Sequence, residues 1–456
     1  MNRQSVCARV IAAGFTFRTA WSPTMPATSP RRSFLQTSAA AGAAWAAGSY
    51  FVSTAPAQQL KSTGDKITVA IMGVNGRGAA LASGFLGQQN CEIAYICDVD
   101  SRAINKVLSP ISEKQSNKPK GVADFRAALD DKSVDALICA APNHWHAPAT
   151  ILGCAAGKHV YVEKPCSHNP REGELAVEAS RKHNRVVQMG SQRRSSPVLT
   201  EGIELVHKGA IGQVLYARTW YNNRRPSIGH GKPAAIPEWL DWTLWQGPAP
   251  DRPFIDNVVH YNWHWKWHWG NGELGNNGVH ALDVARWGLK VDFPIRVTSG
   301  GGKYRHDDDQ ETPDTHVVTY NFPGNKSISW EGLSWSPYGN GGSGFGMSFH
   351  GTEGTIVLED GYRHLDPRNK EIEAKKGGGG EREHIANFLE CIRTGKRPNA
   401  DIAEAHKSTL LCHLGNIAHR TNRVLTTSEK DGHIVGDEQA MQLWSREYRA
   451  GWEPKV

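Results

Sequence analysis

The sequence predicts an α/β fold with two domains, and three observations lead to this prediction. A short apolar strand, a glycine-rich turn, a helix and a second strand ending in an acidic residue follow one another within residues 66–98. Short apolar strands then alternate with helical segments up to residue 190, which is typical of a parallel sheet covered by helices. Further strands joined by turns are expected over 296–299, 316–322, 326–333, 345–351 and 355–359, with amphipathic helices over 383–393 and 402–425.

Composition excludes several classes of protein. The chain has 456 residues, enough for two domains with full-sized cores. Its net charge of +7 comes mainly from five arginines in residues 1–57, and the rest of the chain holds 47 basic and 45 acidic residues. This near balance gives no electrostatic reason to expect a nucleic acid partner. No apolar run after residue 57 is long enough to cross a bilayer, so no stable membrane span is expected there.

The N-terminal segment resembles an export signal. Arg31 and Arg32 begin the pattern RRSFLQ, an Ala/Gly-rich stretch follows, and Ala55-Pro56-Ala57 offers a small-residue cleavage site. We therefore expect residues 1–57 to be a twin-arginine (Tat) signal, with the Tat translocase as a partner and a periplasmic or secreted destination. The seven later cysteines show no CxxC spacing, which agrees with small buried side chains and with folding before export.

The first strand and its turn indicate a dinucleotide site. The strand 66–72 runs into Gly73-Val74-Asn75-Gly76-Arg77-Gly78, and a helical segment begins at Ala79. Glycines let the backbone approach a pyrophosphate, and the free N–H groups at a helix start bind phosphate oxygens. Asn75 stands at the central glycine of G-x-G-x-x-G, and Asn tolerates a left-handed backbone. The residues expected to bind the cofactor in this turn are Gly73, Asn75, Gly76, Arg77 and Gly78.

Three further strand ends extend this site. The strand 92–97 ends at Asp98, whose carboxylate would bind ribose hydroxyls and repel a 2′-phosphate, which favours NAD over NADP. The strand 134–140 leads into a loop expected over 141–146, and the strand 159–162 ends in Glu-Lys-Pro. Doubly wound sheets bind ligands at the carboxyl ends of their strands. The expected cofactor-binding residues at these ends are Asp98, Pro142, Asn143, His146, Glu163 and Lys164.

These motifs, together with the segment 275–283 (GNNGVHALD), resemble the glucose–fructose oxidoreductase/inositol dehydrogenase/MocA (Gfo/Idh/MocA) family over residues 66–425. The resemblance implies nicotinamide-dependent redox chemistry, usually on a sugar or polyol. It implies a Rossmann domain, placed at 58–190, and an α/β domain with an open, largely antiparallel sheet, placed at 191–425. We expect the second domain to bind substrate and to support a homo-oligomer, and residues 426–456 to form a tail packed on the domains.

The resemblance also assigns candidate catalytic residues. Removing a hydroxyl proton requires a base, and a cation stabilises the developing negative charge. By resemblance, Lys164 bonds to the reacting hydroxyl and shuttles its proton, and His280 assists. Relatives usually carry an acidic residue four positions before this histidine, but here that residue is Asn276, which can position a hydroxyl and cannot take its proton. His280 as a structural residue is the alternative, and Asp283 either orients His280 or faces solvent or an arginine.

Tryptophan-rich segments suggest a carbohydrate cleft. Nine of the 16 tryptophans lie between residues 220 and 287. Residues 261–269 alternate aromatic and polar residues, which predicts an extended strand with its tryptophans on one face. Trp263 and His264 would then contact a sugar, while a core stripe or subunit interface is the alternative. No carboxylate or cysteine completes a set with the nearby histidines, so no metal is expected. Arg193 would grip substrate oxygens or lie in a solvated loop.

The sequence thus predicts a secreted NAD-dependent oxidoreductase that acts on a sugar or glycoside hydroxyl. A periplasm holds little free NAD, so tight retention of the nucleotide is expected. Two alternatives stay open: a glycoside hydrolase or lyase that works by transient oxidation and elimination, and a carbohydrate-binding relative without catalysis.

Overall fold

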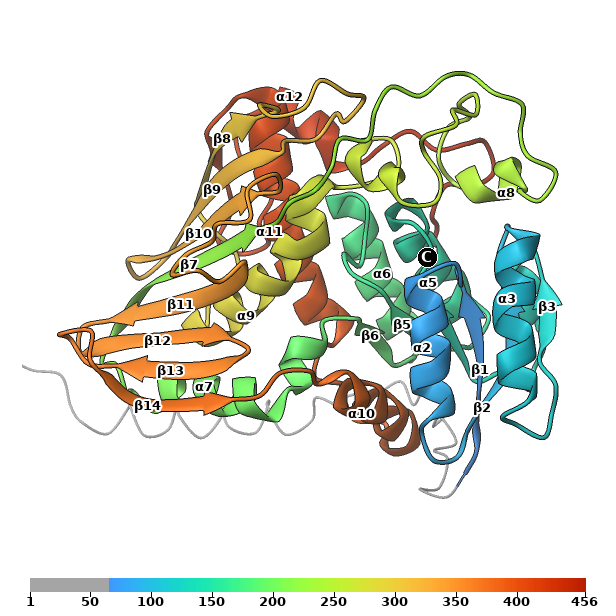
Figure 1. The fold of residues 1–456 in the computed structure, drawn as a ribbon, viewed down its shortest axis with the longest axis horizontal. Coiled ribbons are helices and arrows are strands. Elements are labelled where there is room, and N and C mark those ends of the chain that lie inside the picture. The colour runs from blue at the N-terminus through green and yellow to red at the C-terminus, as the bar shows by residue number, and fades with distance from the viewer. Residues whose placement is uncertain (1–64) are drawn as a thin grey trace, which may run out of the picture. The chain divides into compact units, whose positions relative to one another are not determined.

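The computed structural model describes residues 65–456, which form one sheet of six strands and one of nine (Figure 1). The predicted α/β class with two sheets is confirmed. The predicted Tat signal at residues 1–57 lies outside the described residues. Among the described residues, no helix combines the length and apolar character needed to span a membrane.

The first sheet is parallel, with strand order β3-β2-β1-β4-β5-β6. Its inner strands are apolar on both faces because helices cover both sides. Its elements are β1 (Ile67–Met72), α2 (Arg77–Leu86), β2 (Cys91–Cys97), α3 (Ser101–Ser112), β3 (Lys120–Val122), α4 (Arg126–Asp130), β4 (Ala136–Cys139), α5 (Asn143–Ala155), β5 (His159–Val162), α6 (Pro170–Lys182) and β6 (Val187–Met189).

One local prediction in this domain is wrong. The segment 141–146 was expected as a loop, but α5 already begins at Asn143. Pro142 precedes the helix, and its carbonyl accepts a hydrogen bond from the Trp145 N–H at 2.9 Å, which closes the first turn. The early start buries Trp145 and His146 against the domain and carries Asn143 to the sheet edge.

The second sheet has the order β14-β13-β12-β11-β7-β10-β9-β8-β15 and is antiparallel except for the parallel pair β7 and β10. This confirms the expected open, largely antiparallel sheet. Helices α9 (Val279–Leu289) and α11 (Ile402–Thr421) pack on it, and Figure 1 shows them between this sheet and the first domain. The strands are β7 (Val214–Asn222), β8 (Arg296–Gly302), β9 (Thr315–Phe322), β10 (Lys326–Leu333), β11 (Phe345–Gly351), β12 (Gly354–Glu359), β13 (Gly361–Leu365), β14 (Glu371–Lys376) and β15 (Leu425–Thr426).

The C-terminal region returns to the first domain. Helix α10 (Glu381–Thr394) packs on α2, and after α11 the chain reaches α12 (Glu438–Met441). Helix α7 (Pro197–His207) lies earlier in the chain, before β7. Helix α11 was expected to reach residue 425 but ends at Thr421, because Asn422 adopts a left-handed backbone with φ of 53°. Trp452 of the tail packs edge-on against Trp145, with ring centroids 5.3 Å apart.

The tryptophan-rich segment is not a strand. We call residues 238–269 the tryptophan belt; it holds the short helix α8 (Trp242–Gln246) and the 3₁₀ turn η2 (Asn262–Trp265). Trp242 stacks on Trp245 at 4.7 Å, and both meet Trp269 edge-on. The alternating pattern failed as a predictor because these rings pack on one another in a small core instead of on a sheet face. The alternative of a core stripe is correct for these three tryptophans.

Candidate active site

A cavity of about 540 Å³ lies at the carboxyl edge of the parallel sheet, beneath the belt. Most of the expected site residues line it. They are Gly73, Asn75, Gly76, Arg77, Asp98, Pro142, Asn143, His146, Glu163, Lys164, Trp263, His264 and Asn276. Gly78, Arg193 and His280 are not part of this lining. The structure therefore brings the expected cofactor residues and most of the expected substrate residues to one cavity.

The glycine turn fits a nucleotide pyrophosphate. Gly73 has a φ of 82°, the left-handed region that favours glycine, and a Cβ at Gly78 would overlap the Gly73 carbonyl oxygen. Among the described residues, no side chain caps the start of α2 and no acidic residue lies in its first turn. Its N–H groups are therefore available to an anion. The left-handed backbone suggested for Asn75 falls instead on Gly73.

Asp98 lies where the ribose of a dinucleotide is bound in this kind of fold. Its carboxylate accepts hydrogen bonds from the Val74 N–H at 2.6 Å and the Asp100 N–H at 2.9 Å. These bonds fix the plane of the carboxylate and leave further lone pairs for hydroxyl groups. Burial raises the pKa of Asp98, and the two backbone hydrogen bonds oppose that shift. The glycine turn and Asp98 together fit the cofactor that the sequence predicts.

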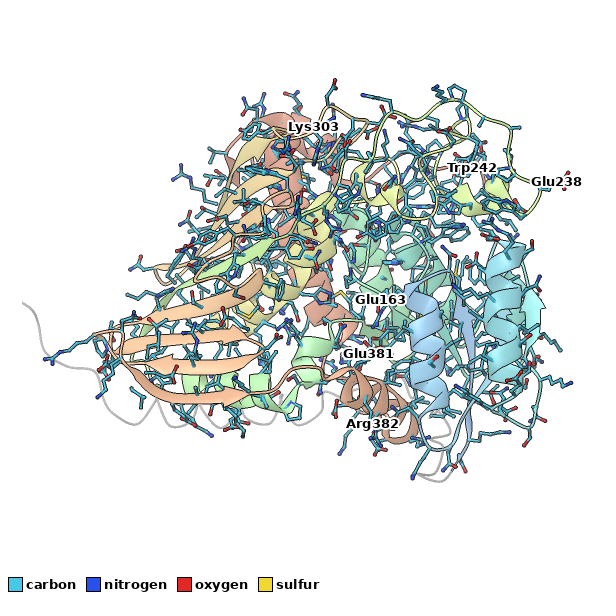
Figure 2. All side chains as sticks on the ribbon, viewed as in Figure 1. Glu163, Glu238, Trp242, Lys303, Glu381 and Arg382 are labelled. Carbon is cyan, nitrogen blue, oxygen red and sulfur yellow. The ribbon has the colours of Figure 1, made fainter. Side chains whose placement is uncertain are left out.

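Two charged residues of the lining are already paired with each other. Arg77 Nε lies 2.7 Å from Glu163 Oε1, and Arg77 Nη1 lies 2.8 Å from Glu381 Oε2 on α10. Figure 2 labels the two glutamates, which approach the same place from β5 and from α10. These ion pairs connect the glycine turn, the end of β5 and the C-terminal region, so Arg77 and Glu163 frame the cavity.

His146 also has a structural task. Its ring nitrogens lie 2.6 Å from the Pro165 carbonyl oxygen and 2.7 Å from the Ala141 carbonyl oxygen. The side chain thus connects the segments that follow β4 and β5. Because backbone groups occupy both nitrogens, His146 positions the loops of the cofactor site, although its ring also lines the cavity.

Lys164 follows β5 and lines the cavity beside the second domain, whereas Asp98 follows β2, which is separated from β5 by β1 and β4. Its Nζ donates to Asn276 Oδ1 at 2.9 Å and to the Asn276 carbonyl oxygen at 3.0 Å. Asn276 belongs to the π-helical turn η3 (Leu274–Gly278), a widened turn of a kind often found at functional sites. Burial lowers the pKa of Lys164, with Arg77 and Arg225 acting in the same direction against two carboxylates. The lysine is thereby shifted toward the amine form that a proton acceptor requires.

His280 lies one turn beyond Asn276, at the start of α9. Burial lowers its pKa well below the usual value, and the nearby Lys164 charge adds to the shift. Its Nδ1 is buried and finds no hydrogen-bond partner among the described residues. An unpaired buried nitrogen near Lys164 is consistent with the predicted catalytic role of His280, which stays a prediction.

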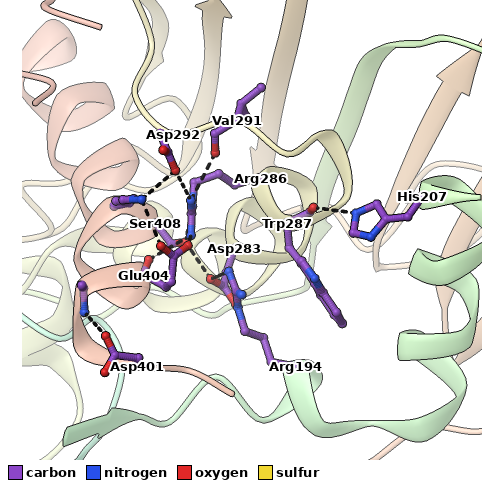
Figure 3. Close-up of polar contacts among 12 residues, drawn as sticks. Arg194, His207, Asp283, Arg286, Trp287, Val291, Asp292, Asp401, Glu404 and Ser408 are labelled. Carbon is purple, nitrogen blue, oxygen red and sulfur yellow. Dashed lines mark hydrogen bonds and ion pairs between the residues drawn. The ribbon is translucent and has the colours of Figure 1, made fainter. Parts of the chain in front are cut away.

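Two of the open questions about neighbouring residues are resolved. Asp283 pairs with Arg194 through bonds of 2.8 and 2.9 Å and also accepts from Ser408, as Figure 3 shows, so it does not orient His280. Arg193 Nη1 donates to the Glu359 carbonyl oxygen at 3.1 Å, away from the cavity lining. Arg193 is therefore not placed in the cavity lining, and the structure does not support the expected contact between Arg193 and a substrate in that cavity.

The belt supplies the aromatic part of the lining. The imidazole of His264 stacks on Trp263 with centroids 3.6 Å apart, and its Nδ1 lies 2.6 Å from the Tyr261 carbonyl oxygen. Burial lowers the pKa of His264 to about 3, so the ring is neutral at ordinary pH. With Nδ1 donating to Tyr261, Nε2 is left as an acceptor. Trp263 thus belongs to both the packed core and the cavity wall.

The histidines of the belt do not form a metal site. His260 Nε2 lies 2.8 Å from Asp100 Oδ2, and His268 Nε2 lies 2.8 Å from the Pro250 carbonyl oxygen. Across residues 65–456, no group of three His, Cys, Asp or Glu side chains is arranged to hold a metal ion.

Sequence reasoning missed several residues of the site. Trp245 and His260 line the cavity from the belt. Glu273 is buried behind Asn276, and its carboxylate pairs with Arg225 at 2.6 Å. Glu273 precedes Asn276 by three residues, so helical spacing could have revealed it. Arg225 lies 48 residues earlier in a loop, and no motif marks it.

Several curated proteins resemble parts of the chain. It is 25% identical over 273 residues to the levoglucosan dehydrogenase of Pseudarthrobacter phenanthrenivorans, covering 56% of this chain and 63% of that protein. It is 29% identical over 208 residues to a glycosyl hydrolase family 109 protein of Saccharopolyspora erythraea, covering 42% and 45% respectively. The matched regions therefore span less than two thirds of these relatives.

Solved structures share the fold. The aldose–aldose oxidoreductase of Caulobacter crescentus, complexed with glycerol, superposes with a TM-score of 0.63 at 18% identity, over 79% of this chain and 99% of that one. A levoglucosan dehydrogenase in complex with NADH and levoglucosan gives a TM-score of 0.61 at 18% identity, over the same shares.

Family models cover both domains. Residues 67–191 match the NAD-binding Rossmann fold of the oxidoreductase family, and residues 216–454 match the C-terminal α/β domain of the same family. The chain belongs to the Gfo/Idh/MocA family of NAD-binding oxidoreductases.

Proposed function

We propose that this protein oxidises a hydroxyl group of a sugar or glycoside with a nucleotide that stays bound between turnovers and is reoxidised by a second, carbonyl-bearing substrate. The observation that carries the proposal is a single cavity that joins the glycine turn and Asp98 to Lys164 and Asn276. The relative named levoglucosan dehydrogenase supports a carbohydrate substrate.

The residues suit the chemistry of alcohol oxidation. NAD, when bound, supplies the acceptor for hydride. Lys164 would bond to the reacting hydroxyl oxygen and hold its proton, while Asn276 fixes the lysine. Trp263 offers a flat apolar surface to a sugar ring, and the His264 imidazole offers an acceptor to a neighbouring hydroxyl. Such a mixed aromatic and polar wall is typical of sites for small carbohydrates.

The belt supports retention of the nucleotide. Its residues 239–241 bond to the segment after β2: the Ser101 N–H donates to the Trp239 carbonyl at 3.0 Å, and the Asp241 N–H donates to the Val99 carbonyl at 2.9 Å. His260 of the belt pairs with Asp100 in the same segment. These contacts close the belt over the side of the cavity that Asp98 lines, and Figure 1 shows α8 above α3.

A second part of the belt is fixed as well. The Trp145 Nε1–H donates to the Trp245 carbonyl at 3.1 Å, and the Arg449 N–H of the tail donates to the Pro248 carbonyl at 3.1 Å. Together these bonds hold the belt over the cavity, which would slow the exit of a nucleotide bound beneath it. Retention would suit a protein exported folded through the Tat system, and we propose that residues 1–57 direct this export.

A redox-assisted glycoside hydrolase is the second candidate. Relatives named as glycosyl hydrolase family 109 proteins favour it. In such a reaction, transient oxidation would acidify a neighbouring C–H, elimination would break the glycosidic bond, water would add to the resulting double bond, and the hydride would return to the carbonyl carbon. The same cavity residues would serve both reactions.

One experiment separates these candidates. The protein is purified, part of it is denatured to identify any released nucleotide, and the native remainder is incubated with a panel of sugars and glycosides. Accumulation of reduced nicotinamide with a keto-sugar supports oxidation. Release of free sugar without net reduction supports hydrolysis. Absence of both nucleotide and turnover would overturn the proposal and leave the carbohydrate-binding alternative.

A further inference from the structure

A chain of hydrogen bonds runs from the cavity into the second domain behind it. Lys164 Nζ donates to Asn276 Oδ1 at 2.9 Å, and Asn276 Nδ2 donates to Glu273 Oε1 at 3.4 Å. The Glu273 carboxylate in turn accepts from Arg225 Nε at 2.6 Å and Nη2 at 3.3 Å, and Asn277 Nδ2 donates to it too. Glu273 is 3% exposed, so this carboxylate is held inside the protein.

The direction of these bonds fixes the Asn276 amide. A carboxylate paired with arginine accepts hydrogen bonds and donates none. The NH₂ group of Asn276 must therefore face Glu273, and its oxygen must face Lys164. The lysine then donates two N–H groups to Asn276, one to Oδ1 and one to the carbonyl oxygen. The remaining position on Nζ is a lone pair in the amine and an N–H in the ammonium.

The charges around Lys164 come in neutral pairs. Glu163 is paired with Arg77 at 2.7 Å, and Glu273 is paired with Arg225 at 2.6 Å. The atoms in contact with the lysine are thus the neutral oxygens of Asn276, and each nearby carboxylate has its own arginine. The imidazoles that face the same charge are His146, His264 and His280.

We propose that Glu273 is a positioning residue that holds the Asn276 oxygen toward Lys164, and that this neutral contact lets the Lys164 amine take the proton of the substrate hydroxyl. The inference rests on the proposed function. The proton moves from the hydroxyl oxygen to Nζ, which becomes an ammonium. Its three N–H groups then point to the two oxygens of Asn276 and to the alkoxide oxygen. Asn276 is thus a working replacement for the carboxylate usual in relatives.

Two variants test this arrangement through turnover. Glu273→Gln leaves the Asn276 amide free to rotate, so we expect kcat to fall about tenfold with little change in KM. Adding Asn276→Asp to that variant supplies an oxygen acceptor that needs no orientation, so kcat should recover at pH values above the acid limb, where the lysine is again an amine. The new anion beside Lys164 should move the acid limb of the pH–rate profile upward by about one pH unit. Nucleotide content after denaturation checks that each variant folds.

A second readout needs no substrate. Acetic anhydride labels lysine amines. The folded protein is labelled at a series of pH values and then digested, and mass spectrometry of the peptides gives the pH of half-maximal labelling for Lys164. Exposed Lys132 serves as the internal reference. Lys164 should label at a lower pH than Lys132 in the wild type. The midpoint for Lys164 should rise by about one unit in the double variant, while that of Lys132 stays.

Unchanged labelling midpoints and no recovery of kcat in the double variant would overturn the inference. The labelling also separates it from the proposed function. If Lys164 shifts as expected but no preparation acts on any sugar or glycoside, the proposed function fails. If turnover occurs and Glu273→Gln keeps the wild-type kcat, the proposed function stands and the role of Glu273 is refuted.

Discussion

The two walls of the cavity differ in the groups they present, because one offers mostly backbone atoms and the other offers side chains. The wall on the parallel sheet consists of the glycine turn from Gly73 to Arg77, where α2 starts, and of the carboxylate of Asp98, so it offers mostly backbone groups. The opposite wall consists of side chains from the belt and from η3, including Trp263, His264 and Asn276. Backbone N–H groups recognise a phosphate in any member of a fold, whereas side chains set which hydroxyl is held and how.

The difference separates affinity for the nucleotide from reactivity toward the sugar. Changes to the first wall should remove the nucleotide, and changes to the second should stop turnover while the nucleotide stays bound. Lys164 stands where the walls meet, because it follows β5 of the first domain and bonds to Asn276 of the second.

The largest expected effect comes from Lys164→Met. The substitution keeps the length of the side chain and removes its nitrogen, so proton transfer loses its acceptor. We expect kcat to fall by at least about a thousandfold, within the range for a lost acid–base group together with its charge. Turnover measured beside nucleotide content checks this, and a variant that retains wild-type kcat would contradict the assignment.

A smaller loss is expected for His280→Ala. The buried Nδ1 lacks a partner among the described residues, but His280 is outside the cavity lining. We expect kcat to fall about a hundredfold with nucleotide content unchanged. An unaltered kcat would identify His280 as a structural residue.

The first wall is tested by Gly78→Ala with Gly87→Ala, at the far end of α2 and outside the cavity lining, as its matched control. The added Cβ at 78 would overlap the Gly73 carbonyl oxygen, whereas at 87 the nearest atoms lie 3.5 Å from it. We expect the first variant to lose most of its nucleotide and the second to keep it, as measured by nucleotide released on denaturation. Equal content in both would show that the close packing of the turn is unimportant.

The belt is tested by Asp100→Asn, which weakens the pair with His260 at the Asp98 side of the cavity. A lost charge-assisted hydrogen bond is worth about 1.5 kcal/mol, so the nucleotide should dissociate about tenfold faster. Glu238→Gln, an exposed site on the same belt, is the control and should leave the rate unchanged. The release rate is followed by exchange with labelled NAD; equal rates would remove the belt from the account of retention.

The smallest effect on the site is expected for Asp283→Asn, which lies behind both walls. Burial alone would raise the pKa of Asp283, but Arg194 outweighs it and holds that pKa below its usual value. A depressed carboxyl pKa stabilises the fold above pH 4, and the benefit is lost as pH falls through the folded-state pKa. The variant should lose about 3 kcal/mol of stability at pH 7 and less at pH 3, as measured by denaturant unfolding.

The parallel sheet was largely predictable because its strands are short apolar runs that alternate with helical segments. The belt was not, because its period of two is local, whereas Trp242 and Trp269 meet only in the folded chain. The site divides in the same way. Lys164 and Asn276 lie in motifs, but Arg225 reaches Glu273 from a loop far away in sequence. Tertiary contacts of this kind leave no pattern in a single sequence.

The central claim is that one cavity couples a retained nucleotide to oxidation of a sugar hydroxyl. The most direct measurement mixes the purified protein, without added NAD, with an excess of each sugar or glycoside and follows the absorbance of reduced nicotinamide. The account predicts a single rise that matches the bound nucleotide for at least one substrate, and none in Lys164→Met. Protein that contains nucleotide, yet shows neither reduction nor bond cleavage with any sugar or glycoside, would contradict it.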